Sequence, residues 1–126
     1  ATTADFDALF KEVNLGPEFD YLQVDCEPSM VTYKSMLKID LDKYKFGTIT
    51  FEHDKYNDGP EVQEKSREYL TKRGYELIVD DISVDDQHPF EDWWAHPDMV
   101  PSHTIKAMKC VTGETKRASD YMLGKV

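Results

Sequence analysis

The sequence predicts an α/β fold in three layers, with helices on both faces of a mixed sheet of about four strands. Short runs rich in apolar, β-branched and aromatic residues alternate with longer segments of helical periodicity, which is typical of parallel strands joined by helices. The last two strands are separated by a short loop, so we expect a C-terminal antiparallel hairpin. The chain of 126 residues is long enough for one domain. We expect this single α/β domain to span residues 1–112, and residues 113–126 to form a loosely held tail.

The first part of the chain alternates helix and strand. Phe6–Val13 has apolar residues at helical spacing, and Thr2 or Thr3 is available to cap this helix. Tyr21–Val24 follows as a short strand. A second helix is expected over Ser29–Lys38, because serine is a favoured N-terminal capping residue.

The middle of the chain adds a buried strand and the clearest helix. Gly47–Phe51 is β-branched and aromatic, the composition of a buried strand. The next helix begins at Pro60, whose missing N–H would be unpaired there anyway, and ends at Gly74. Glu61 and Lys65 form a favourable pair four residues apart, so the charges of this helix predict a solvated face rather than a site.

The last third contains the expected hairpin and a final helix. Tyr75–Val79 and Phe90–Ala95 are predicted to pair antiparallel. Trp93 and Trp94 are adjacent in the second strand and point to opposite faces, so we expect at least one of them in the core. Ser102–Lys109 is the last predicted helix.

Composition excludes several classes of function. The net charge is −10, which disfavours binding to nucleic-acid phosphates and to anionic membrane surfaces. No apolar run approaches the ~20 residues of a membrane span, and no basic-then-apolar leader is evident. Cys26 and Cys110 are far apart and lack metal-site spacing. We therefore expect reduced thiols in a cytoplasmic protein.

Ionisable residues follow two of the predicted strands. Asp25 and Glu27 come after the first strand, and Glu52, His53 and Asp54 come after the second. Ligands of open α/β sheets bind beyond the carboxyl ends of parallel strands. If these strands are neighbours, about 4.8 Å apart, the groups share one edge of the sheet. His88, in the loop that joins the last two strands, could reach the same edge.

Three roles for this edge remain open. Asp25, Glu27, His53 and Asp54 could bind a divalent cation such as Mg²⁺ or Mn²⁺ through carboxylate oxygens and one imidazole. One of the groups could instead be a general base whose pKa is tuned by its neighbours. Alternatively, the acidic residues simply favour the N-terminus of the following helix.

The glycines bear on cofactor binding. A nucleotide-binding α/β fold usually holds its cofactor in a G-x-G turn, where the backbone approaches the ligand closely. The six glycines of this chain contain no such cluster; they are Gly16, Gly47, Gly59, Gly74, Gly113 and Gly124.

Five segments carry a family resemblance that covers roughly Thr3 to Val100. They are Asp20–Pro28, Phe46–Asp54, Ser66–Leu70, Arg73–Asp80 and Phe90–Asp98. Together they resemble the carboxyl-terminal half of FkbM-like S-adenosylmethionine-dependent methyltransferases. The D-x-E element after the first strand is common to many such proteins, and the E-H-D and D-W-W-x-H-P-D runs look like one subgroup.

The resemblance implies a fold and an activity. Members have a seven-stranded Rossmann-like sheet and transfer a methyl group, often to a hydroxyl of a sugar or another natural product. The four predicted strands resemble strands four to seven, which makes this chain a partial Rossmann-like, methyltransferase-type sheet. Asp25 and Glu27 then face the methyl donor and the acceptor, and Asp25 or His53 is the expected base. The first three strands, with the glycine loop that holds S-adenosylmethionine, have no counterpart here.

The sequence therefore predicts a methyltransferase-related fragment or short relative, with Asp25, Glu27 and His53 as its catalytic residues. The alternatives are a non-catalytic module that associates with itself and a small metal-binding protein. Self-association is expected because Tyr21–Val24 lacks a neighbour on one side, and its exposed edge could pair with a second copy to form a homodimer.

Overall fold

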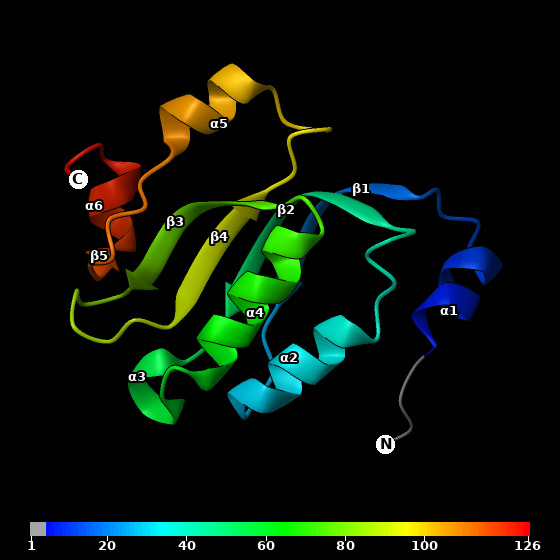
Figure 1. Cartoon of the computed structure of the whole chain (residues 1–126), viewed down its shortest axis with the longest axis horizontal. Coiled ribbons are helices and arrows are strands. Elements are labelled where there is room, and N and C mark those ends of the chain that lie inside the picture. Colours follow the sequence, from blue (N-terminus) through cyan, green and yellow to red (C-terminus); the bar gives the residue numbers. More distant parts are fainter. Residues whose placement is uncertain (1–4) are drawn as a thin grey trace.

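The computed structural model describes residues 5–126 and is an α/β fold (Figure 1). Its helices are α1 (Phe6–Glu12), α2 (Ser29–Leu37), α3 (Lys55–Asp58), α4 (Glu61–Lys72), α5 (Ser102–Met108) and α6 (Ala118–Met122). Its strands are β1 (Glu18–Val24), β2 (Lys45–Glu52), β3 (Glu76–Ser83), β4 (Glu91–Ala95) and β5 (Lys116–Arg117). The short elements α3, β5 and α6 were not predicted, because segments of two to five residues are too short to show a periodicity.

The sheet has the order β1-β2-β4-β3-β5. β1 and β2 are parallel neighbours, as expected, and β4 runs antiparallel to both β2 and β3. The antiparallel hairpin of β3 and β4 is confirmed. Because β4 lies between β2 and β3, the strands β1, β2 and β3 all run in the same direction.

Helices α2 and α4 cover one face of the sheet. Met36 of α2 and Leu70 of α4 are fully buried against Ile49, Phe51 and Trp94 of the central strands. This cluster is the larger of two apolar cores. It fixes β2 and β4 in the middle of the sheet, where they position the segments that follow and precede them.

Helices α5 and α6 lie on the opposite face. Ile105 of α5 and Tyr121 of α6 pack with Ile78 and Trp93 in the second core. Trp94 is 2% exposed in the first core, which confirms that at least one of the adjacent tryptophans is a core residue. The two cores on opposite faces give the three layers that the sequence predicts.

The C-terminal segment is held more firmly than predicted. Residues 113–126 were expected to be a loose tail, but Lys116 and Arg117 pair with the end of β3. The Lys116 ammonium is buried, and it donates to Asp80 Oδ1 at 2.5 Å and to the Glu114 carbonyl. Burial alone would raise the pKa of Asp80, but the hydrogen bonds from Lys116 and from two backbone amides lower it. The sequence after Gly113 shows no clear helical or strand pattern, so the buried pair of Lys116 and Asp80 was not predicted.

The predicted caps Thr2 and Thr3 lie outside the described residues. Within them, Asp5 caps α1 by accepting from the Ala8 amide at 3.1 Å. Across residues 5–126, no helix has the length and apolar character needed to cross a bilayer.

Candidate functional site

The parallel strands β1, β2 and β3 end at the same edge of the sheet. Asp25 and Glu27 follow β1, Glu52 ends β2, and the loop after β3 carries Asp85 and His88. Helix α3 and the β3–β4 loop meet there (Figure 1). The first two contributions were predicted from the sequence. The third comes from the loop between β3 and β4, from which His88 was expected to be able to reach this edge.

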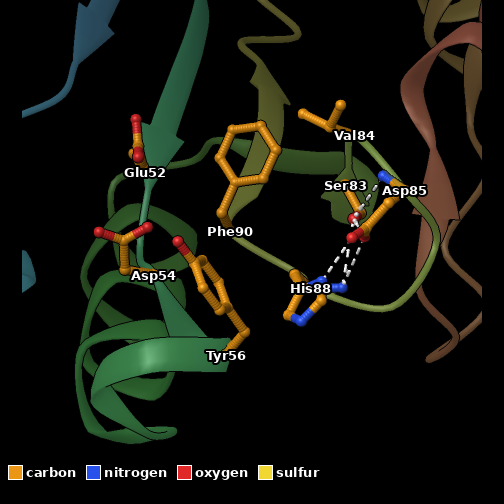
Figure 2. A pocket seen from close by; sticks show the side chains of 8 residues that line it. All are labelled: Glu52, Asp54, Tyr56, Ser83, Val84, Asp85, His88 and Phe90. Carbon is orange, nitrogen blue, oxygen red and sulfur yellow. Dashed lines mark hydrogen bonds and ion pairs between the residues drawn. The ribbon is translucent and has the colours of Figure 1, made fainter.

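A pocket of about 450 Å³ opens at this edge, and Figure 2 shows the side chains around it. Its lining residues are Glu52, Asp54, Tyr56, Ser83, Val84, Asp85, His88 and Phe90. Glu52 and Asp54 stand on one side, and Asp85 and His88 on the other (Figure 2). A second depression, of about 410 Å³, shares Glu52, Asp54 and Tyr56 and continues towards Glu27.

Backbone hydrogen bonds hold the two sides of the pocket together. The amides of His53 and Asp54 both donate to the Phe90 carbonyl, at 2.7 and 3.1 Å, and the Tyr56 amide donates to the Pro89 carbonyl. Asp54 has a φ of 48°, in the left-handed region that is uncommon for residues other than glycine. This turn directs the chain from β2 into α3, and it places Tyr56 over the pocket.

The carboxyl groups of this edge are crowded. Burial, a hydrogen bond with Asp25 and the charges of Asp25 and Asp54 raise the pKa of Glu52 to about 8. Burial also raises the pKa of Asp54, and the charges of nearby carboxylates add to this effect. Glu52 therefore carries a proton at neutral pH, so it is able to donate a hydrogen bond as well as accept one.

The opposite side of the pocket is an ordered loop. Asp85 Oδ1 accepts from Ser83 Oγ and from the amides of Gln87 and His88, and Ser83 is buried. Asp85 Oδ2 lies 2.5 Å from His88 Nδ1. These hydrogen bonds lower the pKa of Asp85, which is therefore an anion at neutral pH. The rings of Tyr56 and His88 pack edge to face, with 5.3 Å between the ring centres.

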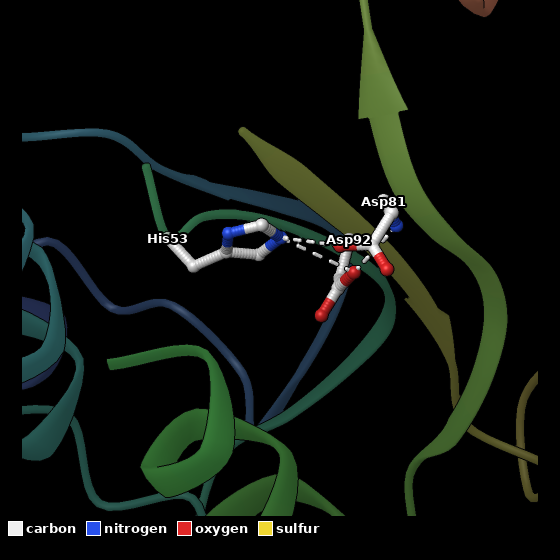
Figure 3. A group of neighbouring side chains, drawn as sticks. All are labelled: His53, Asp81 and Asp92. Carbon is white, nitrogen blue, oxygen red and sulfur yellow. Dashed lines mark hydrogen bonds and ion pairs between the residues drawn. The ribbon is translucent and has the colours of Figure 1, made fainter. Parts of the chain in front are cut away.

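His53 faces away from this pocket. It is fully buried and points towards Asp81 and Asp92 (Figure 3). Its Nε2 lies 3.4 Å from Asp92 Oδ1 and 3.8 Å from Asp81 Oδ1, and makes no hydrogen bond. The amide of Lys55 donates to His53 Nδ1 at 3.1 Å, so the proton of the neutral ring is on Nε2.

His53, Asp81 and Asp92 each offer one ligand atom, all within 4.8 Å of one another, so this buried group could hold a metal ion. Two contacts oppose an ion. The guanidinium of Arg67 already binds both oxygens of Asp92 and lies 3.6 Å from Asp81. A metal on His53 Nε2 would also displace the ring proton to Nδ1, which would break the hydrogen bond from Lys55.

The structure brings the predicted site residues together only in part. Asp25 and Glu27 are exposed at the edge, and Asp54 lies in the pocket wall with 8% of its surface exposed. His53 does not join them, so the predicted set of four metal ligands does not form. Successive residues of an extended segment point in opposite directions, and the interior partners of His53 turn it inwards.

Residues that the sequence prediction omitted complete the pocket. Glu52 was recognised at the strand end but not among the site residues, and Tyr56 was not considered. Asp85 and His88 were placed in the loop between the last two strands, and only His88 was expected to be able to reach this edge, which it does. Their spacing of three residues, directly after a strand, was the available signal.

Comparison of the chain with known protein families, curated proteins and solved structures gave no match. The geometry of the site therefore carries the functional argument.

Proposed function

We propose that this chain is the acceptor-binding half of a methyltransferase-type domain, which transfers a methyl group from S-adenosylmethionine to a hydroxyl of a small acceptor. One observation carries the proposal. Three strands of the same direction deliver ionisable side chains to one edge of the sheet, where a pocket of about 450 Å³ opens. This is where open α/β sheets bind their ligands.

The strand directions are compatible with the proposal. The resemblance implies that this chain supplies strands four to seven, and the closing hairpin was expected to add one antiparallel strand to the parallel ones. β4 is that antiparallel strand, and it lies between β2 and β3. The edge of β1 faces away from β2, on the side where the remaining strands of such a sheet would add.

The lining of the pocket favours a neutral, hydroxylated acceptor. None of its eight lining residues is lysine or arginine, and three of them carry carboxyl groups, so the pocket offers an anionic ligand no permanent positive charge. The protonated Glu52 can both donate to and accept from a hydroxyl. Tyr56 and Phe90 add aromatic surface to the same pocket. Asp25 and Glu27, exposed at the same edge, are the groups that would hold further hydroxyls of the acceptor.

The glycines of this chain do not fit S-adenosylmethionine. A Cβ on Gly47 would lie 3.0 Å from the Asp20 carbonyl, and one on Gly74 would lie 3.3 Å from His96, so these glycines serve close packing within the fold. None of the others lies between a strand and a following helix in a G-x-G turn. In this proposal, the cofactor is held by a second half that this chain does not provide.

The experiment is to read the coding sequence directly upstream of Ala1 and to express it together with this chain. We expect it to encode a strand followed by a G-x-G turn. Calorimetry should give micromolar affinity for S-adenosylmethionine in the extended protein and little or no binding to the present chain. Micromolar binding to the present chain, or an upstream sequence without the turn, would contradict the proposal.

A second candidate is binding of a divalent metal such as Mg²⁺ or Mn²⁺, favoured by the 4.8 Å grouping of His53, Asp81 and Asp92. Since Arg67 already balances these carboxylates, we expect millimolar Mg²⁺ or Mn²⁺ to leave the melting temperature unchanged. A rise that the Asp81→Asn variant abolishes would favour the metal-binding function instead, because ligands stabilise the state that binds them.

A further inference from the structure

The β3–β4 loop presents a histidine whose orientation is fixed by a carboxylate. Asp85 Oδ2 lies 2.5 Å from His88 Nδ1. Because an ionised carboxylate only accepts hydrogen bonds, the proton of the neutral imidazole is on Nδ1 and the lone pair is on Nε2. Asp85 is itself fixed by Ser83 Oγ and by the amides of Gln87 and His88. The ring orientation is therefore set by the loop.

The histidine is accessible and faces the pocket. The side chains of His88 and Asp85 are 56% and 50% exposed, so a ligand can reach them. Both line the pocket opposite Glu52 and Asp54 (Figure 2). Tyr56 packs against the imidazole and limits its rotation.

The other bases of this edge are less suited to accept a proton. His53 is fully buried, and its Nε2 faces Asp92. Glu52 already holds a proton at neutral pH. An imidazole oriented by a carboxylate is a recurrent general base, because the carboxylate fixes the tautomer and stabilises the imidazolium that forms.

We propose that His88 is the catalytic base of this pocket and that Asp85 is its positioning residue. This inference rests on the proposed function. The O–H bond of the acceptor hydroxyl breaks and an N–H bond forms at His88 Nε2. The freed oxygen lone pair would form a C–O bond to the methyl carbon of a sulfonium donor supplied by the other half of the domain. The methyl C–S bond would break at the same time, and its electron pair would stay on the sulfur of the departing neutral thioether. Glu52, on the far side of the pocket, donates a hydrogen bond to the acceptor.

The first test uses the present chain. Long-range ¹H–¹⁵N NMR above the titration range of histidine should show His88 mainly with its proton on Nδ1. Asp85→Asn should reduce the share of this tautomer. Asp86→Asn, which changes the next aspartate of the same loop, should leave it unchanged. A proton mainly on Nε2 in the unchanged chain would overturn the assignment.

The second test uses the extended protein, with methyl glycosides as acceptors and methyl-labelled S-adenosylmethionine. His88→Ala should lower kcat by roughly 10²–10⁴-fold, and added imidazole should restore part of the loss. The control variant His103→Ala changes an exposed residue of α5 and should alter kcat less than twofold. If the extended protein transfers methyl groups and His88→Ala retains full activity, His88 is not the base and the proposed function stands. If the extended protein transfers none, the proposed function fails, and the role of His88 fails with it.

Discussion

The guanidinium of Arg67 binds both carboxylate oxygens of Asp92, with Nε to Oδ2 at 2.7 Å and the second nitrogen to Oδ1 at 2.9 Å. Asp92 is fully buried, and its Oδ1 also accepts from the amide of Asp81 at 3.0 Å. Asp81 has a φ of 52° and lies where the register of β3 and β4 shifts. The pair therefore joins helix α4 to the irregular part of the hairpin, beside the loop that carries the pocket.

Removal of Arg67 should leave a buried carboxylate without compensation. We expect Arg67→Met to lower the free energy of unfolding by about 3 kcal/mol. Arg67→Met with Asp92→Leu should recover part of this loss, because the Asp92 carboxylate is removed together with its partner, whereas Asp81, 3.6 Å from the guanidinium, stays buried. Urea unfolding measures the free energy of both the single and the double variant. Lys72→Met, which breaks the exposed ion pair with Glu68, is the control. Equal losses in the single and double variants would show that the charge pair is not the cause.

The crowded carboxyl groups predict a pH-dependent stability. The pKa of Glu52 is raised from 4.5 to about 8, so the folded protein keeps a proton that the unfolded chain releases between these pH values. Stability therefore falls as the pH rises through this window. Glu52→Gln should stabilise the protein by roughly 1–2 kcal/mol at pH 8.5, after allowance for solvent screening, and by almost nothing at pH 4. Melting curves at several pH values test this prediction, with Glu12→Gln as the control at an exposed position. A stability difference between Glu52→Gln and the unchanged protein that stays constant at every pH would contradict it.

The two tryptophans of β4 should differ in their contribution to stability. Trp94 is 2% exposed in the larger core, whereas Trp93 is only half-buried. Trp94→Ala should cost about 3–5 kcal/mol, and Trp93→Ala distinctly less. Denaturant titration of each variant provides the comparison. A larger loss from Trp93→Ala would mean that the core on the α5 and α6 side dominates.

The edge of β1 predicts self-association of the present chain. Among the strands of residues 5–126, β1 pairs with β2 alone, so within this part of the chain its other side carries unpaired backbone groups. We expect a dimer through this edge, favoured by high salt because Glu18 and Asp20 of the two copies repel each other. Light scattering should show that Tyr21→Lys weakens the dimer and that Thr48→Lys, on the neighbouring interior strand, does not. A monomer mass at high concentration and high salt would rule out edge pairing.

The main elements could be predicted from local patterns. Charged residues follow β1 and end β2, and the parallel pairing of these strands follows from the helix between them. β1 begins at Glu18 rather than Tyr21, because backbone pairing with β2 extends the strand through polar residues. Such boundaries depend on the partner strand, which the local pattern of β1 does not contain.

The site was harder to predict, because it depends on residues distant in sequence. The direction of His53 is set by Asp81 and Asp92, which join it only because β4 inserts between β2 and β3. The same insertion brings the β3–β4 loop, with His88, to the end of β2. The inward direction of His53 cannot be read from spacing along the chain, whereas the loop position of His88 already allowed this residue to reach the edge.

Methyl transfer by the extended protein tests the central claim most directly. With labelled S-adenosylmethionine and methyl glycosides, we expect label on the glycoside hydroxyls. We also expect a large loss in the variant that combines Asp25→Ala with Glu52→Ala, because alanine removes the hydrogen-bonding groups at both positions. No loss is expected in Asp42→Ala, which changes an exposed residue away from the pocket. Absence of label, or label that the double variant incorporates as fast as the unchanged protein, would contradict the assignment of this edge as the acceptor site.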